Sequence, residues 1–187
     1  MAFNVLLWVI IIIAGLIVIM FLTYYNRFAV LKNRIENSAS QIDVQLKKRA
    51  DLVPNLVASV KGYMKHEKSM IEKVTESRKA LIGAKSLQEK VKAGDKLAAA
   101  LKTVFAIAEN YPNLKANENF LQLQQELSAI EDKIAYARQF YNDSVLDYDN
   151  LHSTVPGKWF ASLFGKPEEP YLKIPEAEAK LVKVSFE

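Results

Sequence analysis

The stretch from Phe120 to Leu151 reads FLQLQQELSAIEDKIAYARQFYNDSVLDYDNL, and its spacing decides the fold class. Apolar or small side chains recur along it in alternating steps of three and four residues, at Phe120, Leu123, Leu127, Ile130, Ile134, Ala137, Tyr141, Ser144, Tyr148 and Leu151. This is the spacing of the a and d positions in a helical bundle or coiled coil. We therefore expect a helix from Ala116 to Ser153, roughly 57 Å long, that buries this stripe.

Two further apolar stripes at helical spacing precede this stretch. The first consists of Phe28, Leu31, Ile35, Ser38 or Ala39, Ile42 and Leu46. The second consists of Val53, Leu56, Val60, Tyr63, Met70, Val74 and Leu81. Amphipathic helices of this kind are stabilised by packing their apolar faces together.

Proline and glycine mark the expected breaks between helices. Val53-Pro54 disfavours helical geometry before the proline, so we predict a turn there, with a kinked continuous helix as the alternative. Ala93-Gly94-Asp95 predicts a stop and a new start, followed by a helix of roughly Asp95 to Asn110. Tyr111-Pro112-Asn113 predicts a tight turn. Four helices with short connections predict an all-α fold, an antiparallel four-helix bundle over residues 26–153.

A long apolar run lies upstream of the first stripe. Val5 to Leu22 read VLLWVIIIIAGLIVIMFL, without a charged side chain. At 1.5 Å per residue the run extends about 27 Å, close to the hydrocarbon thickness of a bilayer. A secretory signal peptide would need a basic start, a shorter apolar run and a small-x-small cleavage site, and MAFN carries no basic side chain. We therefore predict an uncleaved transmembrane helix, with residues 1–25 as the anchor.

Charges beside the anchor predict its orientation. No Lys or Arg precedes it, whereas Arg27, Lys32 and Arg34 follow it closely. The positive-inside rule then predicts a single-pass protein of the cell membrane, with the N-terminus outside and the C-terminal body in the cytoplasm.

The overall composition narrows the function classes. The chain has 187 residues and no cysteine, which leaves no disulfide framework and no thiolate chemistry. Its 25 basic residues are nearly balanced by 21 acidic ones, giving a formal net charge of +4. The two signs interleave, as on a solvated helical surface, whereas nucleic-acid binding favours a clustered basic patch. We expect no nucleic-acid partner.

One polar group lies far along the chain from the anchor: Asp43, Lys47, Lys48, Arg49 and Asp51. On a helix Asp43, Lys47 and Asp51 share a face at intervals of four residues. One interpretation is ion pairing on a solvated face, worth a few tenths of a kcal/mol per pair. The other is a protein contact, including one between identical subunits, because a surface with both charge signs can be self-complementary.

Residues 154–187 form an amphipathic segment and a tail that shows strand-like alternation only at its end. In the segment Trp159, Phe160, Leu163 and Phe164 gather on one side. An up-and-down bundle would bring this aromatic segment back to the membrane end of the body. It caps the bundle in one interpretation, and in the other it is an interfacial helix in contact with lipid.

Candidates for chemistry are few. His66-Glu67 lacks the second histidine of a zinc-protease HExxH, and His152 stands alone. Glu67 falls on the apolar stripe and needs a buried partner, which Arg78 or Arg138 could supply, so we predict a polar network of these three that sets helix register. A metal or proton site is the lesser alternative. We predict no catalytic residue, no metal and no cofactor.

The sequence resembles the LemA family from about Tyr25 to its end. The motifs that carry the resemblance are Asn33-Arg34, Glu36-Asn37, SQIDVQLKKR (40–49), DLVPNLV (51–57), KGY (61–63), His66-Glu67, EKVTESR (72–78), YPNLKANENFLQLQQEL (111–127), IAYARQFYND (134–143), Pro156 and LFG (163–165). Ala39 is a departure, because the family often carries Trp there. The resemblance implies a single-pass membrane protein with an antiparallel four-helix domain and no established enzymatic activity, and by analogy a membrane scaffold.

These observations favour a non-enzymatic, membrane-anchored helical protein. We expect it to self-assemble or to scaffold other membrane proteins at the cytoplasmic face, with the lipid bilayer and a second copy of the chain as partners. Two alternatives stay open: an adaptor or regulator of a membrane protease or signalling protein, and a hydrolase or metal-dependent enzyme. The last lacks a visible nucleophile–base or metal-ligand set.

Overall fold

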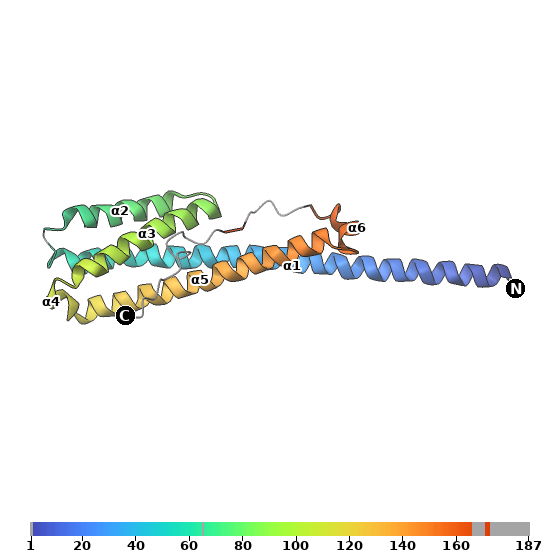
Figure 1. Ribbon diagram of the computed structural model, residues 1–187, viewed down its shortest axis with the longest axis horizontal. Helices are drawn as coiled ribbons and strands as arrows, with labels where there is room; N and C mark the ends of the chain where they lie inside the picture. The colour runs from blue at the N-terminus through green and yellow to red at the C-terminus, as the bar shows by residue number, and fades with distance from the viewer. Residues whose placement is uncertain (1, 65, 166–170, 173–187) are drawn as a thin grey trace, which may run out of the picture. The chain divides into compact units, whose positions relative to one another are not determined.

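The computed structural model describes residues 2–64, 66–165 and 171–172, and within these residues the chain is helical without strands (Figure 1). The helices are α1 (Ala2–Lys61), α2 (Lys68–Gly83), α3 (Leu87–Ala108), α4 (Pro112–Lys115), α5 (Glu118–Ser153) and α6 (Gly157–Ala161). The all-α prediction is confirmed. The predicted strand-like end of the tail lies outside the described residues.

The helices divide into two compact units. Among the described residues, the first unit combines residues 2–37 with residues 140–165 and Tyr171, and the second combines residues 38–64 and 66–139 with Leu172. Because α1 and α5 run through both units, each unit receives one part of these two helices.

The apolar stripes predicted for α1 and α5 form the core of the first unit. Phe28, Leu31 and Ile35 of α1 are buried there, and so are Tyr141, Tyr148 and Leu151 of α5. Along the whole of α5, the ten predicted stripe residues are buried except for Leu123, which is half-buried. The three-and-four spacing therefore identified the buried face correctly.

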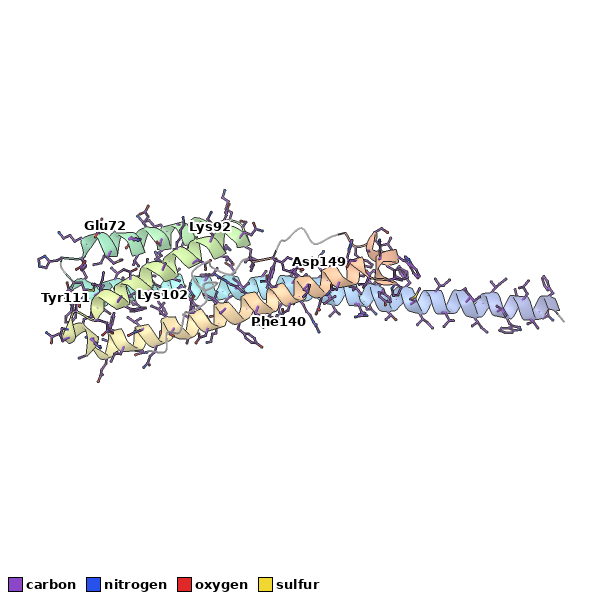
Figure 2. The ribbon with its side chains drawn as sticks, viewed as in Figure 1. Glu72, Lys92, Lys102, Tyr111, Phe140 and Asp149 are labelled. Atoms are coloured by element: carbon purple, nitrogen blue, oxygen red, sulfur yellow. The ribbon has the colours of Figure 1, made fainter. Side chains whose placement is uncertain are left out.

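The N-terminal part of α1 has no packing partner among the described residues. Every side chain from Phe3 to Ile19 is exposed, and these side chains project from the blue end of α1 all round the helix (Figure 2). Here α1 is long and apolar enough to cross a membrane, the one described helix with both properties. The predicted apolar anchor helix is thus present in the structure.

Buried side chains of the second unit come from all its longer helices. They are Ile42, Leu46, Val53 and Leu56 of α1, Val74 and Leu81 of α2, Leu97, Leu101 and Val104 of α3, and Phe120, Leu127 and Ile134 of α5. Helices α2 and α3 lie side by side in Figure 1. The Tyr111-Pro112 break is confirmed, since α3 ends at Ala108 and the proline opens α4.

The predicted turn at Pro54 is wrong, because α1 continues through the proline to Lys61. A proline inside a helix has no N–H for the carbonyl four residues earlier, which here belongs to Ala50. The Nε of Arg78 on α2 donates a hydrogen bond of 2.7 Å to that carbonyl. The helix persists because a side chain replaces the missing donor, and the chain turns instead after Lys61.

The predicted break at Ala93-Gly94-Asp95 is also wrong, since these residues lie inside α3. Gly94 is buried, and a Cβ built on it would lie 2.5 Å from Cδ2 of Leu46, so the glycine permits a close approach of α1. The actual start is a capping box, in which the Ser86 hydroxyl accepts from the Glu89 backbone N–H and the Glu89 carboxylate accepts from the Ser86 N–H.

Candidate membrane-interface site

Six aromatic rings join α1 to α6 and the residues that follow it. Phe160 lies 5.8 Å from Phe21 and 5.7 Å from Tyr24, measured between ring centroids. Phe164 lies 5.2 Å from Tyr25 and stacks on Phe28 at 4.7 Å. We call these six residues the aromatic clasp. Each such ring pair adds about 0.5–1.5 kcal/mol to the free energy gained by burying area.

Two features of the chain hold the clasp in place. The Tyr148 hydroxyl of α5 donates to the carbonyl of Gly165 at 2.8 Å, and Gly165 has the positive φ of 66° that glycine adopts without strain. The second feature is the close contact of Gly157, at the start of α6, with the end of α5. A Cβ on this glycine would lie 2.1 Å from the carbonyl oxygen of Leu151, so a larger residue would push α6 away from α5. Burial, and then the charge of Asp149, raise the pKa of Tyr148, so its hydroxyl stays protonated and donates.

The structure divides the predicted lipid-contact group into two pairs. Phe160 and Phe164 are half-buried against α1 in the clasp. Trp159 and Leu163 are each 65% exposed, although both are large and apolar. The clasp contains Phe21, which belongs to the apolar run of α1, so the two exposed side chains belong to a segment packed at the end of that run.

Beside the clasp, α1 and α5 enclose a groove of about 520 Å³. We call it the Arg27 groove, and it is lined by Tyr24, Asn26, Arg27, Val30, Leu31 and Arg34 of α1 and by Asp147, Asn150, Leu151 and Thr154 near the end of α5. The guanidinium carbon of Arg27 lies 5.8 Å from the centre of the Tyr24 ring. The groove thus combines two guanidinium groups and two amides with an apolar wall.

Arg49 of the predicted protein-contact group lies inside the second unit. It is 1% exposed, donates to the carbonyl of Gly94 at 3.2 Å and pairs with Glu131. Burial, together with the charge of Arg138, lowers its pKa to about 10, against the opposite effect of Asp95. Arg49 is therefore not available on the surface. The sequence held a signal for this, because Ile42, Leu46, Arg49 and Val53 follow each other at stripe spacing.

A family model named LemA family matches residues 38–186 of the sequence. The chain belongs to the LemA family. It is 31% identical over 115 residues to Protein LemA of Metamycoplasma hominis, which covers 59% of this chain and 51% of the relative. It is 23% identical over 167 residues to magnetosome protein MamQ of Magnetospirillum gryphiswaldense, covering 75% of this chain and 61% of the relative. The chain thus matches only about half to three-fifths of these relatives' lengths.

The LemA match includes α2, α3, α4, α5 and α6 and begins inside α1. The apolar run of α1 and its side of the clasp precede the match, whereas Phe160 and Phe164 lie within it. An apolar helix near the N-terminus and the similarity to MamQ both support association of this LemA-family chain with a membrane.

The other members of the predicted protein-contact group are more accessible. Lys47, Lys48 and Asp51 are exposed on α1. Asp43 is half-exposed and pairs with Lys90 of α3 at 2.7 Å. Three charged side chains with both signs therefore remain on the surface of this LemA chain.

The predicted network of Glu67, Arg78 and Arg138 is not brought together. Glu67 accepts a long hydrogen bond of 3.5 Å from the Tyr111 hydroxyl, Arg78 donates to Ala50, and Arg138 pairs with Asp95. Sequence reasoning missed Asp95 and Glu131, which partner the two arginines Arg138 and Arg49. No group of three or more potential metal ligands gathers within the part of the chain that the structure describes.

Proposed function

We propose that this LemA-family chain is a single-pass membrane scaffold. Its body would be an antiparallel four-helix bundle at the cytoplasmic face that assembles with copies of itself or with other membrane proteins. The observation that carries the proposal is the apolar run of α1, exposed from Phe3 to Ile19, which continues as one helix into a body with its own buried core.

The anchoring part of the proposal follows from the cost of exposing apolar surface. Soluble monomers rarely expose contiguous apolar patches larger than a few hundred Å². A helix that is apolar all round for about 27 Å matches the bilayer in length and in chemistry. Arg27, Lys32 and Arg34 directly after the run favour a cytoplasmic body.

The bundle part of the proposal is supported by chain order. Helices α1, α2, α3 and α5 follow each other through short connections and all bury apolar side chains. Short connections favour antiparallel neighbours. The 60 residues of α1 would then combine the anchor with the first helix of the bundle.

The scaffold part of the proposal rests on exposed charged residues and on sequence similarity. Lys47, Lys48 and Asp51 present both charge signs on the exposed face of α1, which suits contact between identical subunits. Similarity to a magnetosome protein supports the membrane association that such a scaffold requires.

We expect the full-length chain, solubilised in mild detergent, to have a protein mass of more than one copy by light scattering. Reversing charge with K47E and K48E should shift this mass toward one copy. The matched variant K73E/K79E changes two exposed lysines of α2 and should leave the mass unchanged. A strictly monomeric wild type at membrane-like concentrations would remove self-assembly from the proposal.

The membrane end of the body makes a second contact in this proposal. With Phe160 and Phe164 packed on α1, the exposed side chains of Trp159 and Leu163 would enter the interfacial layer of the bilayer. Tryptophan suits this layer because its ring is apolar and its N–H is polar.

A further inference from the structure

We propose that the Arg27 groove binds the phosphate headgroup of an anionic membrane phospholipid. The inference rests on the proposed membrane anchor and deepens it, since it names a lipid class and a site. Both walls of the groove belong to the first unit, one from α1 and one from α5.

The distance of the groove from the apolar run matches the position of lipid headgroups. Arg27 lies five residues beyond Leu22, the last residue of the apolar run, or about 7.5 Å along the helix. A headgroup layer extends roughly 5–8 Å beyond the hydrocarbon on each side. Arg34 lies two turns further on the same face, and a long arginine side chain can extend its guanidinium back toward the interface.

The polar lining fits a phosphate. A guanidinium offers paired N–H donors that match two phosphate oxygens, and the amides of Asn26 and Asn150 add neutral donors. Asp147 is the acidic residue of the lining and opposes an anion. Residue numbers rise toward the clasp along α5 and away from the clasp along α1. Asp147 therefore lies at the end of the groove far from the clasp, whereas Arg27 lies near the clasp. The phosphate therefore lies at the end with Arg27, Asn150 and Thr154.

The apolar lining selects a lipid over a free phosphate ion. Tyr24, Val30, Leu31 and Leu151 form apolar surface next to the polar groups. From a headgroup held at Arg27, acyl chains reach the exposed apolar run of α1 directly. Inorganic phosphate would leave this surface in contact with water, so it gains less from the same site.

The test is lipid retention by the full-length chain. Protein in detergent is mixed with phosphatidylglycerol or phosphatidylcholine, and bound lipid is counted by native mass spectrometry. We expect preferential retention of phosphatidylglycerol, lowered about fivefold by R27Q. K32Q is the matched control, because Lys32 is exposed on α1 and does not line the groove. N150D should lower retention as R27Q does, whereas N110D, at an exposed site elsewhere, should not.

Each contrary result has a distinct meaning. Equal losses in R27Q and K32Q would replace the groove with diffuse attraction to basic charge and overturn the site. Equal retention of the two lipids would overturn the headgroup chemistry, and displacement by millimolar inorganic phosphate would overturn the lipid as its source. Release of the wild-type chain from membranes by alkaline carbonate would instead refute the anchor, so the two failures are separable.

Discussion

Pro54 deprives the carbonyl of Ala50 of its helical donor, and Arg78 supplies another from a different helix. A buried carbonyl without a partner costs about 1–3 kcal/mol. The side chain of Arg78 therefore does two things: it completes α1 and it attaches α2 to it. Arg49 likewise joins α3 and α5 to α1 through the Gly94 carbonyl and Glu131.

We predict that R78L destabilises the protein by about 1–2 kcal/mol, because it leaves the Ala50 carbonyl without a donor. P54A restores the backbone N–H, so R78L should cost clearly less in a P54A background. Urea unfolding of all four variants, followed by helical circular dichroism, measures the coupling. K79L removes a neighbouring exposed cation of α2 and serves as the control. Equal costs of R78L in both backgrounds would contradict the assigned hydrogen bond.

Particular residues show what the sequence could predict at this scale. The seam of α5 was predictable because its side chains repeat locally at helical spacing. The partners of Arg78, Arg49 and Arg138 were not, since each pairing joins positions at least 28 residues apart. The start of α3 has a local signal that the prediction of a break at Gly94 did not use, because Ser86 and Glu89 have the three-residue spacing of a capping box.

At the scale of elements, the helix boundaries depend on which neighbour each helix meets. Pro54 and Gly94 weaken a helix in isolation, and both lie inside helices here. The hydrogen bond from Arg78 replaces the donor that Pro54 lacks. The missing side chain of Gly94 leaves room for Leu46 to pack closely. The spacing of apolar residues therefore predicted the buried faces of the helices correctly, whereas proline and glycine predicted two helix ends wrongly. Helix α6 could not be assigned a position from its five residues alone, because rings of α1 fix it.

The clasp leads to a prediction about α6. Replacing the exposed pair, W159S/L163S, should lower the fraction of the body's C-terminal segment inserted in vesicles while leaving the melting temperature unchanged. Replacing the packed pair, F160S/F164S, should lower the melting temperature by several degrees, because four ring contacts are lost. A cysteine introduced at position 158 and labelled with an environment-sensitive fluorophore measures insertion in every variant, since the chain has no other cysteine. A fall in melting temperature for W159S/L163S alone would assign these side chains to packing instead of lipid contact.

At the scale of the whole molecule, one continuous helix connects apolar surface with a polar, self-packed body. The anchor was predictable because its signal is local, a run of consecutive apolar side chains. The Arg27 groove was not predictable, because its two walls come from positions more than 110 residues apart in the sequence. Sidedness depends on charges that flank the run, and these are present on one side only.

The absence of cysteine makes this sidedness directly measurable. We predict that N4C is labelled by a membrane-impermeant maleimide added to intact cells, whereas K102C is labelled only after permeabilisation, because the positive-inside rule applied to Arg27, Lys32 and Arg34 predicts a cytoplasmic body. Both positions are exposed, so burial does not protect either thiol. Adding arginines at positions 2 and 4 while neutralising Arg27, Lys32 and Arg34 should reverse the pattern in a fraction of the molecules. Labelling of K102C in intact cells carrying the unaltered flanks would place the body outside and would also remove the cytoplasmic partners from the proposal.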